Sequence, residues 1–174
     1  MTQTLHNHRR TGLILAFITL ILDQALKFAV MGPLNLPAIG QIEILPFFNL
    51  TWVQNFGVSM GFLQADSPAM RWGLVALTAV IACGVVVWMW RETRRGDVLS
   101  LGLVLGGALG NIIDRVRLGY VADFADLHIG EFRPFLIFNL ADAAITIGVL
   151  ILLIRALLVR DPPKQPEVTE TLDA

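Results

Sequence analysis

Four apolar stretches, each long enough to cross a bilayer, constrain this chain more than any other feature of its sequence. A helix needs roughly 20 mostly apolar residues to span the hydrocarbon core. Such stretches lie at about residues 11–30, 69–90, 98–116 and 140–159. Charged residues make up 16% of the chain, whereas a soluble domain usually carries about 25%. The sequence therefore predicts an all-α membrane protein with four transmembrane helices.

The first apolar stretch follows a pair of arginines, as a cleaved signal peptide would. Asp23 and Lys27 interrupt it, however, and no clear Ala-x-Ala site follows, so we expect an uncleaved span. We expect one membrane-embedded domain over residues 1–160. The remaining tail, residues 161–174, combines three prolines with several acids and is predicted to be disordered.

The basic residues between the predicted spans favour one orientation. With four spans, both termini share a side with the loop at 91–97. The basic residues of that side are Arg9, Arg10, Arg91, Arg94, Arg95, Arg155, Arg160 and Lys164. The opposite loops, 31–68 and 117–139, hold only Arg117 and Arg133, with Lys27, Arg71 and Arg115 at nearby span ends. The positive-inside rule therefore predicts cytoplasmic termini and two outer loops.

The first outer loop contains a strand pattern. Phe48, Leu50 and Trp52 alternate with Asn49 and Thr51, which is typical of a half-buried strand. We expect a small extracytoplasmic β-sheet on the outer membrane surface.

Polar residues cluster at the outer ends of the spans, where each is a functional hypothesis because burying it is costly. Asp23 and Lys27 lie four residues apart in the first span. Two interpretations fit this pair equally well. One is an ion pair within the helix, with Lys27 extending toward water, and the other is a functional role. Asn55 and Gly57 in the first outer loop fit a plain turn better than a site on this pattern alone.

The third span carries a glycine at every fourth position from Gly102 to Gly110. This smooth face should let a neighbouring helix approach closely. Asn111, Asp114 and Arg115 follow on one helical face. We expect Asp114 and Arg115 to be charge partners, whether as a structural salt bridge or as support for a site.

Two further acids flank the start of the fourth span. Asp142 lies in its first turn, where acids often only complement the helix dipole, and Asn139 is placed to cap it. Asp123 precedes the span, in a stretch that returns to the membrane. Both acids are reached from the same aqueous side and can converge.

Other catalytic chemistries lack partners in this sequence. The only lysines are Lys27 and Lys164, the second in the tail, which disfavours a serine–lysine enzyme. Cys83 lies mid-span without a histidine on its helix, and His128 is the one histidine expected outside, too few for zinc. Paired aspartates can share one proton and activate water without metal or cofactor. A net charge of −1 gives no polybasic surface for nucleic acid.

Five motifs, in order and at the outer span ends, resemble those of the bacterial lipoprotein signal peptidases, or signal peptidase II. They are Asp23-Gln24, Asn55-x-Gly57, Gly110 to Arg115 (GNIIDR), Val121 to Phe124 (VADF) and Phe138 to Asp142 (FNLAD). The resemblance implies an aspartic endopeptidase of the bacterial cytoplasmic membrane. It would cut diacylated prolipoproteins just before the lipidated cysteine, contact membrane lipid and bind globomycin-type inhibitors.

The resemblance also implies roles for single residues. Asp123 and Asp142 match the catalytic dyad. The matching supporting residues are Asp23, Asn55, Gly57, Asn111, Asp114, Arg115 and Asn139. Two details depart from the family pattern and bear on loop packing and inhibitor fit. Met60 stands where phenylalanine is common, and Phe132 with Arg133 replaces a frequent tryptophan stretch.

Two other classes of protein use intramembrane acids. A proton or ion transporter should place acids along the whole bilayer depth, whereas the inner halves of the last three spans hold none. A metal-dependent lipid transferase could use paired aspartates, and sensitivity to chelators would distinguish it from an aspartic peptidase.

Overall fold

The computed structural model describes residues 2–57, 68–130 and 132–158. Within these residues, four helices are long and apolar enough to cross a membrane. They are α1 (Thr2–Met31), α3 (Pro68–Arg91), α4 (Arg95–Arg117) and α5 (Leu140–Leu158). The predicted fold class of four membrane helices with a small sheet is confirmed. The predicted disordered tail and Met60 lie outside the described residues.

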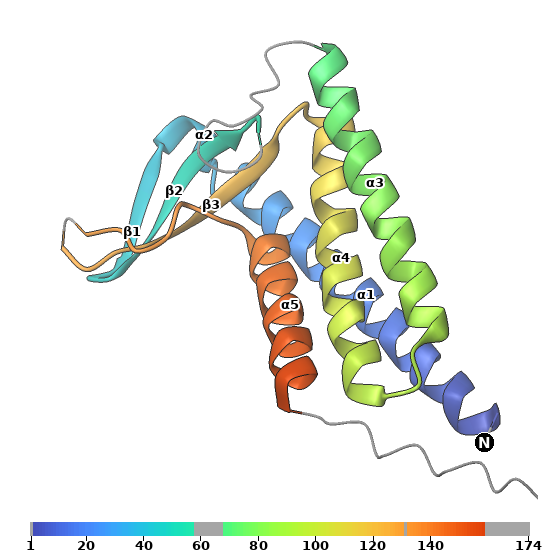
Figure 1. Ribbon diagram of the computed structural model, residues 1–174. Helices are drawn as coiled ribbons and strands as arrows, with labels where there is room; N and C mark the ends of the chain where they lie inside the picture. The colour runs from blue at the N-terminus through green and yellow to red at the C-terminus, as the bar shows by residue number, and fades with distance from the viewer. Residues whose placement is uncertain (1, 58–67, 131, 159–174) are drawn as a thin grey trace, which may run out of the picture.

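The helices alternate in direction, so the bundle has two distinct ends (Figure 1). The start of α1, the connection between α3 and α4, and the end of α5 lie at one end, and the β-sheet lies at the other. Helix α4 is the central element, because it packs against α1, α3 and α5. Side chains on α4 can therefore meet partners from three other helices.

The glycine face of α4 packs against α1, as its spacing predicts. A Cβ added to Gly102 would lie 2.5 Å from the carbonyl oxygen of Gly12, and one added to Gly106 would lie 2.5 Å from that of Ala16. Since backbone meets backbone at these points, only glycine fits. The close approach continues to Gly110, which faces the carboxylate of Asp23.

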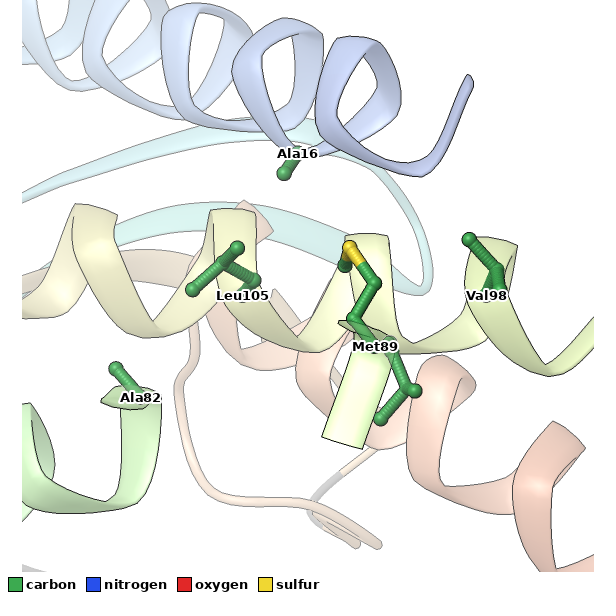
Figure 2. Packing of buried hydrophobic residues seen from close by; sticks show 6 residues of the cluster. Ala16, Ala82, Met89, Val98 and Leu105 are labelled. Carbon is green, nitrogen blue, oxygen red and sulfur yellow. The ribbon is translucent and has the colours of Figure 1, made fainter. Parts of the chain in front are cut away.

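A small apolar core lies between α1, α3 and α4 (Figure 2). It contains Ala16, Ala82, Met89, Val98, Leu101 and Leu105. Many large apolar side chains face outward instead, such as Phe28 on α1, which is 71% exposed, and Val80 on α3, which is 69% exposed. This arrangement suits helices whose outer surface meets lipid rather than water.

Three antiparallel strands form the sheet in the order β1 (Gln41–Leu45), β2 (Phe48–Asn55) and β3 (Val121–Leu127). The short helix α2 (Leu36–Ile39) precedes β1. The predicted strand in the first outer loop is confirmed as β2. Asp123, expected in a stretch that precedes the fourth span, lies in β3 and pairs with Val53 of β2. A strand supported by β2 holds Asp123 more firmly than a loop would.

The close approach of α1 and α4 generates a stability prediction. Gly106→Ala forces a methyl group against the backbone of α1, and overpacking of this kind typically costs about 1–3 kcal/mol. Gly84→Ala is the matched control, because a Cβ at Gly84 of α3 meets nothing within 4 Å. It should be neutral or stabilise by up to about 1 kcal/mol through helix propensity. Thermal unfolding in detergent measures both, and equal stability of the two variants would contradict the packing argument.

Candidate active site

Of the two acids singled out by the sequence, Asp123 lies in β3 and Asp142 in the first turn of α5. Figure 1 shows the sheet beside the start of α5. Asp123 is buried, with 2% of its surface exposed, and points from the middle of β3. Asp142 is partly buried in the first turn of α5. One acid is thus positioned by strand pairing and the other by a helix terminus.

Asn139 connects the two acids. Its Nδ2 donates to Oδ1 of Asp123 at 2.6 Å. Its Oδ1 accepts the backbone N–H of Asp142 at 3.0 Å, and Oδ2 of Asp142 accepts the backbone N–H of Asn139 at 3.3 Å. This reciprocal pair is a capping box that satisfies two backbone donors at the start of α5. The predicted cap is present, and the same residue holds the other acid.

Two more amides complete the contacts of the carboxylates. Asn55, at the end of β2, donates through Nδ2 to Oδ2 of Asp123 at 3.0 Å. Its Oδ1 accepts the backbone N–H of Gly57 at 3.0 Å, so Asn55 serves both a turn and the site. Asn111 of α4 donates through Nδ2 to Oδ1 of Asp142 at 2.8 Å. Each acid therefore accepts hydrogen bonds from groups that do not titrate.

The surroundings of Asp123 change its acidity. Burial, and after it the negative charge of Asp142, raise the pKa of Asp123 from the ordinary 3.8 to about 7. The hydrogen bonds from Asn55 and Asn139 oppose the rise, because they stabilise the ionised form. At neutral pH the Asp123 carboxyl is thus poised between its two protonation states.

An ionic cluster lies beneath the acids, between α1 and α4. The ammonium of Lys27 is 2.8 Å from Oδ2 of Asp23 and 2.7 Å from Oδ2 of Asp114. The lysine is 1% exposed, so the interpretation in which it reaches out to water is wrong. Gln24 adds a hydrogen bond from Nε2 to Oδ1 of Asp114 at 3.0 Å. The ammonium is therefore shielded from bulk solvent and paired with both carboxylates.

The expected pairing of Asp114 with Arg115 is also wrong. Asp114 pairs with Lys27 instead, while Nη2 of Arg115 donates to the carbonyl of Gly57 at 3.1 Å. Adjacent residues on a helix point about 100° apart, so the two side chains diverge although both are buried. Arg71 of α3 donates to the carbonyl of Arg115 at 2.7 Å and so caps the end of α4.

The structure therefore brings the predicted residues together in two layers. Asn55, Asn111 and Asn139 contact the two acids directly, while Asp23 and Asp114 lie below them around Lys27. Arg115 and Gly57 close one side of the site through their mutual hydrogen bond. The bridging position of Lys27 was not predicted, because spacing on one helix cannot reveal a partner on another. In the part of the chain that the structure describes, no group of three or more His, Cys, Asp or Glu side chains is arranged to hold a metal ion.

Comparison with known proteins assigns the family. A family model described as signal peptidase (SPase) II matches residues 15–158. The chain belongs to the signal peptidase II family. It is therefore a peptidase, and its four apolar helices fit a multi-pass bacterial membrane protein.

Similar proteins match over nearly their full length. The signal peptidase II chain is 64% identical to a lipoprotein signal peptidase of Rhizorhabdus wittichii, over 96% of this chain and 95% of the relative. It is 54% identical to a lipoprotein signal peptidase of Sphingopyxis alaskensis, over 94% and 95% of the two chains.

Two solved structures, both described as bacterial membrane enzymes, share the fold. One has a TM-score of 0.73 and 32% identity, and covers 84% of this signal peptidase II chain and 87% of its own. The other has a TM-score of 0.72 and 33% identity, and covers 87% and 94%.

The two described residues that were expected to depart from the family pattern, Phe132 and Arg133, lie in the segment between β3 and α5. Phe132 is 65% exposed. Arg133 extends its guanidinium to the buried Asp126 of β3, with Nε 3.1 Å from Oδ1. Asp126 also accepts a hydrogen bond from Thr51 of β2 at 3.0 Å. The ion pair between Arg133 and Asp126 therefore links the segment before α5 to the sheet.

Proposed function

We propose that this peptidase removes the signal peptides of prolipoproteins, cutting just before a cysteine that already carries diacylglycerol, with Asp123 and Asp142 as its catalytic dyad. The family and the names of the relatives support the substrate class. The observation that carries the mechanism is the convergence of the two carboxyls on Asn139. Asn139 holds both in one site without itself taking part in proton transfer.

The dyad would work as a unit that holds one proton. The ionised carboxylate takes a proton from water as the water oxygen attacks the scissile carbonyl carbon. The protonated carboxyl hydrogen-bonds the carbonyl oxygen and stabilises the charge that develops there. When the C–N bond breaks, a proton passes from the dyad to the leaving amine. The pair titrates jointly, so neither member is assigned one role at all pH values.

The surrounding residues would orient this pair. Asn55, Asn111 and Asn139 fix the carboxylate oxygens, and none of them can compete for the shared proton at neutral pH. Arg115 places a cation beside the site, where it can offset negative charge on the dyad and on the reacting carbonyl. Inhibitors of the globomycin type, implied by the family resemblance, would occupy the same place as the substrate.

We further propose that the site opens to the outer face of the bacterial cytoplasmic membrane. The start of α1, the connection between α3 and α4, and the end of α5 lie at one bundle end, and these segments carry Arg9, Arg10, Arg91, Arg94, Arg95 and Arg155. The sheet, which carries Asp123, lies at the opposite end. Positive charge is retained in the cytoplasm. The exposed apolar side chains of the helices would contact lipid, so that a lipid-anchored substrate could reach the dyad along the membrane plane.

Reporter fusions test this orientation. Fusions after Arg95 and at the C-terminus should report the cytoplasm, and fusions within residues 41–49 should report the outer side. An external C-terminus, or a cytoplasmic sheet, would overturn the proposed orientation while leaving the dyad untouched.

Substitution of either acid tests the dyad. Asp123→Asn and Asp142→Asn keep the side-chain volume but remove a proton-transfer group, so each should fold and bind substrate yet lose cleavage by about three orders of magnitude or more. The double variant should be hardly worse than either single variant, because the two acids act together. Release of the signal peptide from a synthetic diacylated prolipoprotein measures the loss.

Two further observations belong to the same experiment. Near-normal cleavage by either single variant would show that the dyad is assigned wrongly. Cleavage by the unmodified enzyme should survive EDTA and reagents directed at serine or cysteine, whereas a metal-dependent reaction would stop with the chelator.

The raised pKa of Asp123 predicts a pH dependence. A dyad that needs one proton should lose activity as the pH rises through about 7, where Asp123 gives up its proton. The hydrogen bond from Asn55 lowers the pKa of Asp123, so Asn55→Ala should raise that pKa and move the alkaline limb to higher pH. The pH profile of kcat/KM measures the shift.

Thr51→Val is the matched control for this shift. It also removes one donor on β2 from a carboxylate on β3, but that carboxylate is Asp126. The alkaline limb of the Thr51→Val profile should lie at the same pH as that of the unmodified enzyme. A limb that does not move in Asn55→Ala, or moves to lower pH, would contradict the proposed coupling.

A further inference from the structure

Lys27 is buried more completely than the length of its side chain requires. It lies near the end of α1, where a lysine would normally extend its ammonium to the membrane surface. Instead 1% of the residue is exposed, and all three ammonium donors have acceptors. These are Oδ2 of Asp23 at 2.8 Å, Oδ2 of Asp114 at 2.7 Å and Oδ1 of Asn111 at 3.3 Å. A buried cation is stable only with such complete pairing.

The two carboxylates that Lys27 joins each also accept one backbone N–H, and the two backbone groups occupy related positions. Oδ1 of Asp23 accepts the backbone N–H of Ala141 at 3.0 Å. Oδ2 of Asp114 accepts the backbone N–H of Ala122 at 3.2 Å. Ala141 directly precedes Asp142, and Ala122 directly precedes Asp123. The backbone beside each dyad acid is therefore fastened to a carboxylate, and one lysine connects the two carboxylates.

The third contact of Lys27 reaches the dyad through a side chain. The ammonium donates to Oδ1 of Asn111 and so fixes the orientation of this side-chain amide, with its oxygen toward Lys27. The Nδ2 of Asn111 must then face Oδ1 of Asp142, to which it donates at 2.8 Å. Three separate connections thus lead from one ammonium to the two acids.

We propose that Lys27 is a positioning residue that sets the separation and orientation of Asp123 and Asp142. The inference rests on the proposed dyad, and it differs from simple charge neutralisation. Neutralisation requires only a cation near Asp23 and Asp114, whereas positioning requires a compact ammonium that draws both carboxylates to one point. Misplacement of reacting groups by about 1 Å can cost a factor of about 100 in rate.

Two variants of Lys27 separate geometry from charge. Lys27→Met keeps the length of the side chain and removes the charge and the donors. Lys27→Arg keeps the charge, but its planar guanidinium cannot bring both carboxylates to a single nitrogen as the ammonium does. We expect kcat on a synthetic diacylated prolipoprotein to fall about 100-fold or more in Lys27→Met and at least about tenfold in Lys27→Arg. KM should stay within about threefold, because the substrate does not touch Lys27.

The pH profile supplies a readout that stability alone would not move. Asp142, Lys27 and Arg115 are the charged groups that act on Asp123. The cation of Lys27 lowers the pKa of Asp123, so Lys27→Met should move the alkaline limb to higher pH. Lys27→Arg retains the charge and should leave the limb in place while kcat falls.

Arg155→Met is the matched control. Arg155 of α5 pairs with Asp97 of α4, at the bundle end away from the dyad. Its loss also removes an ion pair between helices, so it should lower the melting temperature. It should leave kcat per folded molecule and the pH profile unchanged. Activity is therefore normalised to the folded fraction from size-exclusion chromatography for every variant.

The outcomes are distinct. Unchanged kcat in Lys27→Arg, whether or not Lys27→Met folds, would show that charge alone suffices and would overturn the positioning role. Unchanged kcat and pH limb in a folded Lys27→Met would overturn it as well. Asp123→Asn in the same assay tests the proposed dyad, on which this inference rests. If that variant cleaves the substrate, the dyad is assigned wrongly. If it is inactive while the Lys27 variants are normal, only this inference fails.

Discussion

The close backbone contact between α1 and α4 is the constraint on which the rest of the site depends. Glycines on α4 let the two helices approach until a Cβ at Gly106 would lie 2.5 Å from the carbonyl oxygen of Ala16. At that distance the polar residues two to three turns further along must pack against each other rather than against lipid or water. Asp23 and Lys27 thereby meet Asp114, and the costs of burying three charges are offset by their mutual contacts.

The layer above this ionic cluster holds the two acids with neutral hydrogen-bond donors rather than with charged partners. The direct partners of the two acids are amides and backbone N–H groups, which donate hydrogen bonds without exchanging protons at neutral pH. The charged groups that could disturb a shared proton are kept one layer away. Lys27 and Arg115 act on the acids through the field and through intermediate side chains. A carboxyl pair in such a setting can pass protons to and from a substrate without losing them to its own surroundings.

Hydropathy and local patterns predicted much of this architecture. The four spans, strand β2 and the capping role of Asn139 follow from apolar length, alternation and the preference of asparagine for helix starts. The partners of the charged residues do not follow from such patterns, because Asp23, Asp114 and Lys27 have several possible neighbours until the packing of α1 on α4 is known. Strand β3 was missed for a similar reason. Its sequence, VADFADL, has acids at two of seven positions, and it forms a strand through pairing with β2, far away in the chain.

The hydrogen bonds that would orient the proposed dyad also begin helix α5. Asn139 and Asp142 form the capping box that begins α5, and they are also part of the proposed dyad and its support. Helix termini leave backbone donors that must be satisfied, all the more so at a membrane surface. A carboxylate and an amide at these positions satisfy that need in any helix. Placing β3 against them adds the second acid, since the cap uses only Oδ1 of Asn139 and leaves its Nδ2 free to donate to Asp123 and to Oδ1 of Asn111. The proposed dyad therefore consists of one acid that belongs to the helix cap and a second acid that is hydrogen-bonded to the same cap residue.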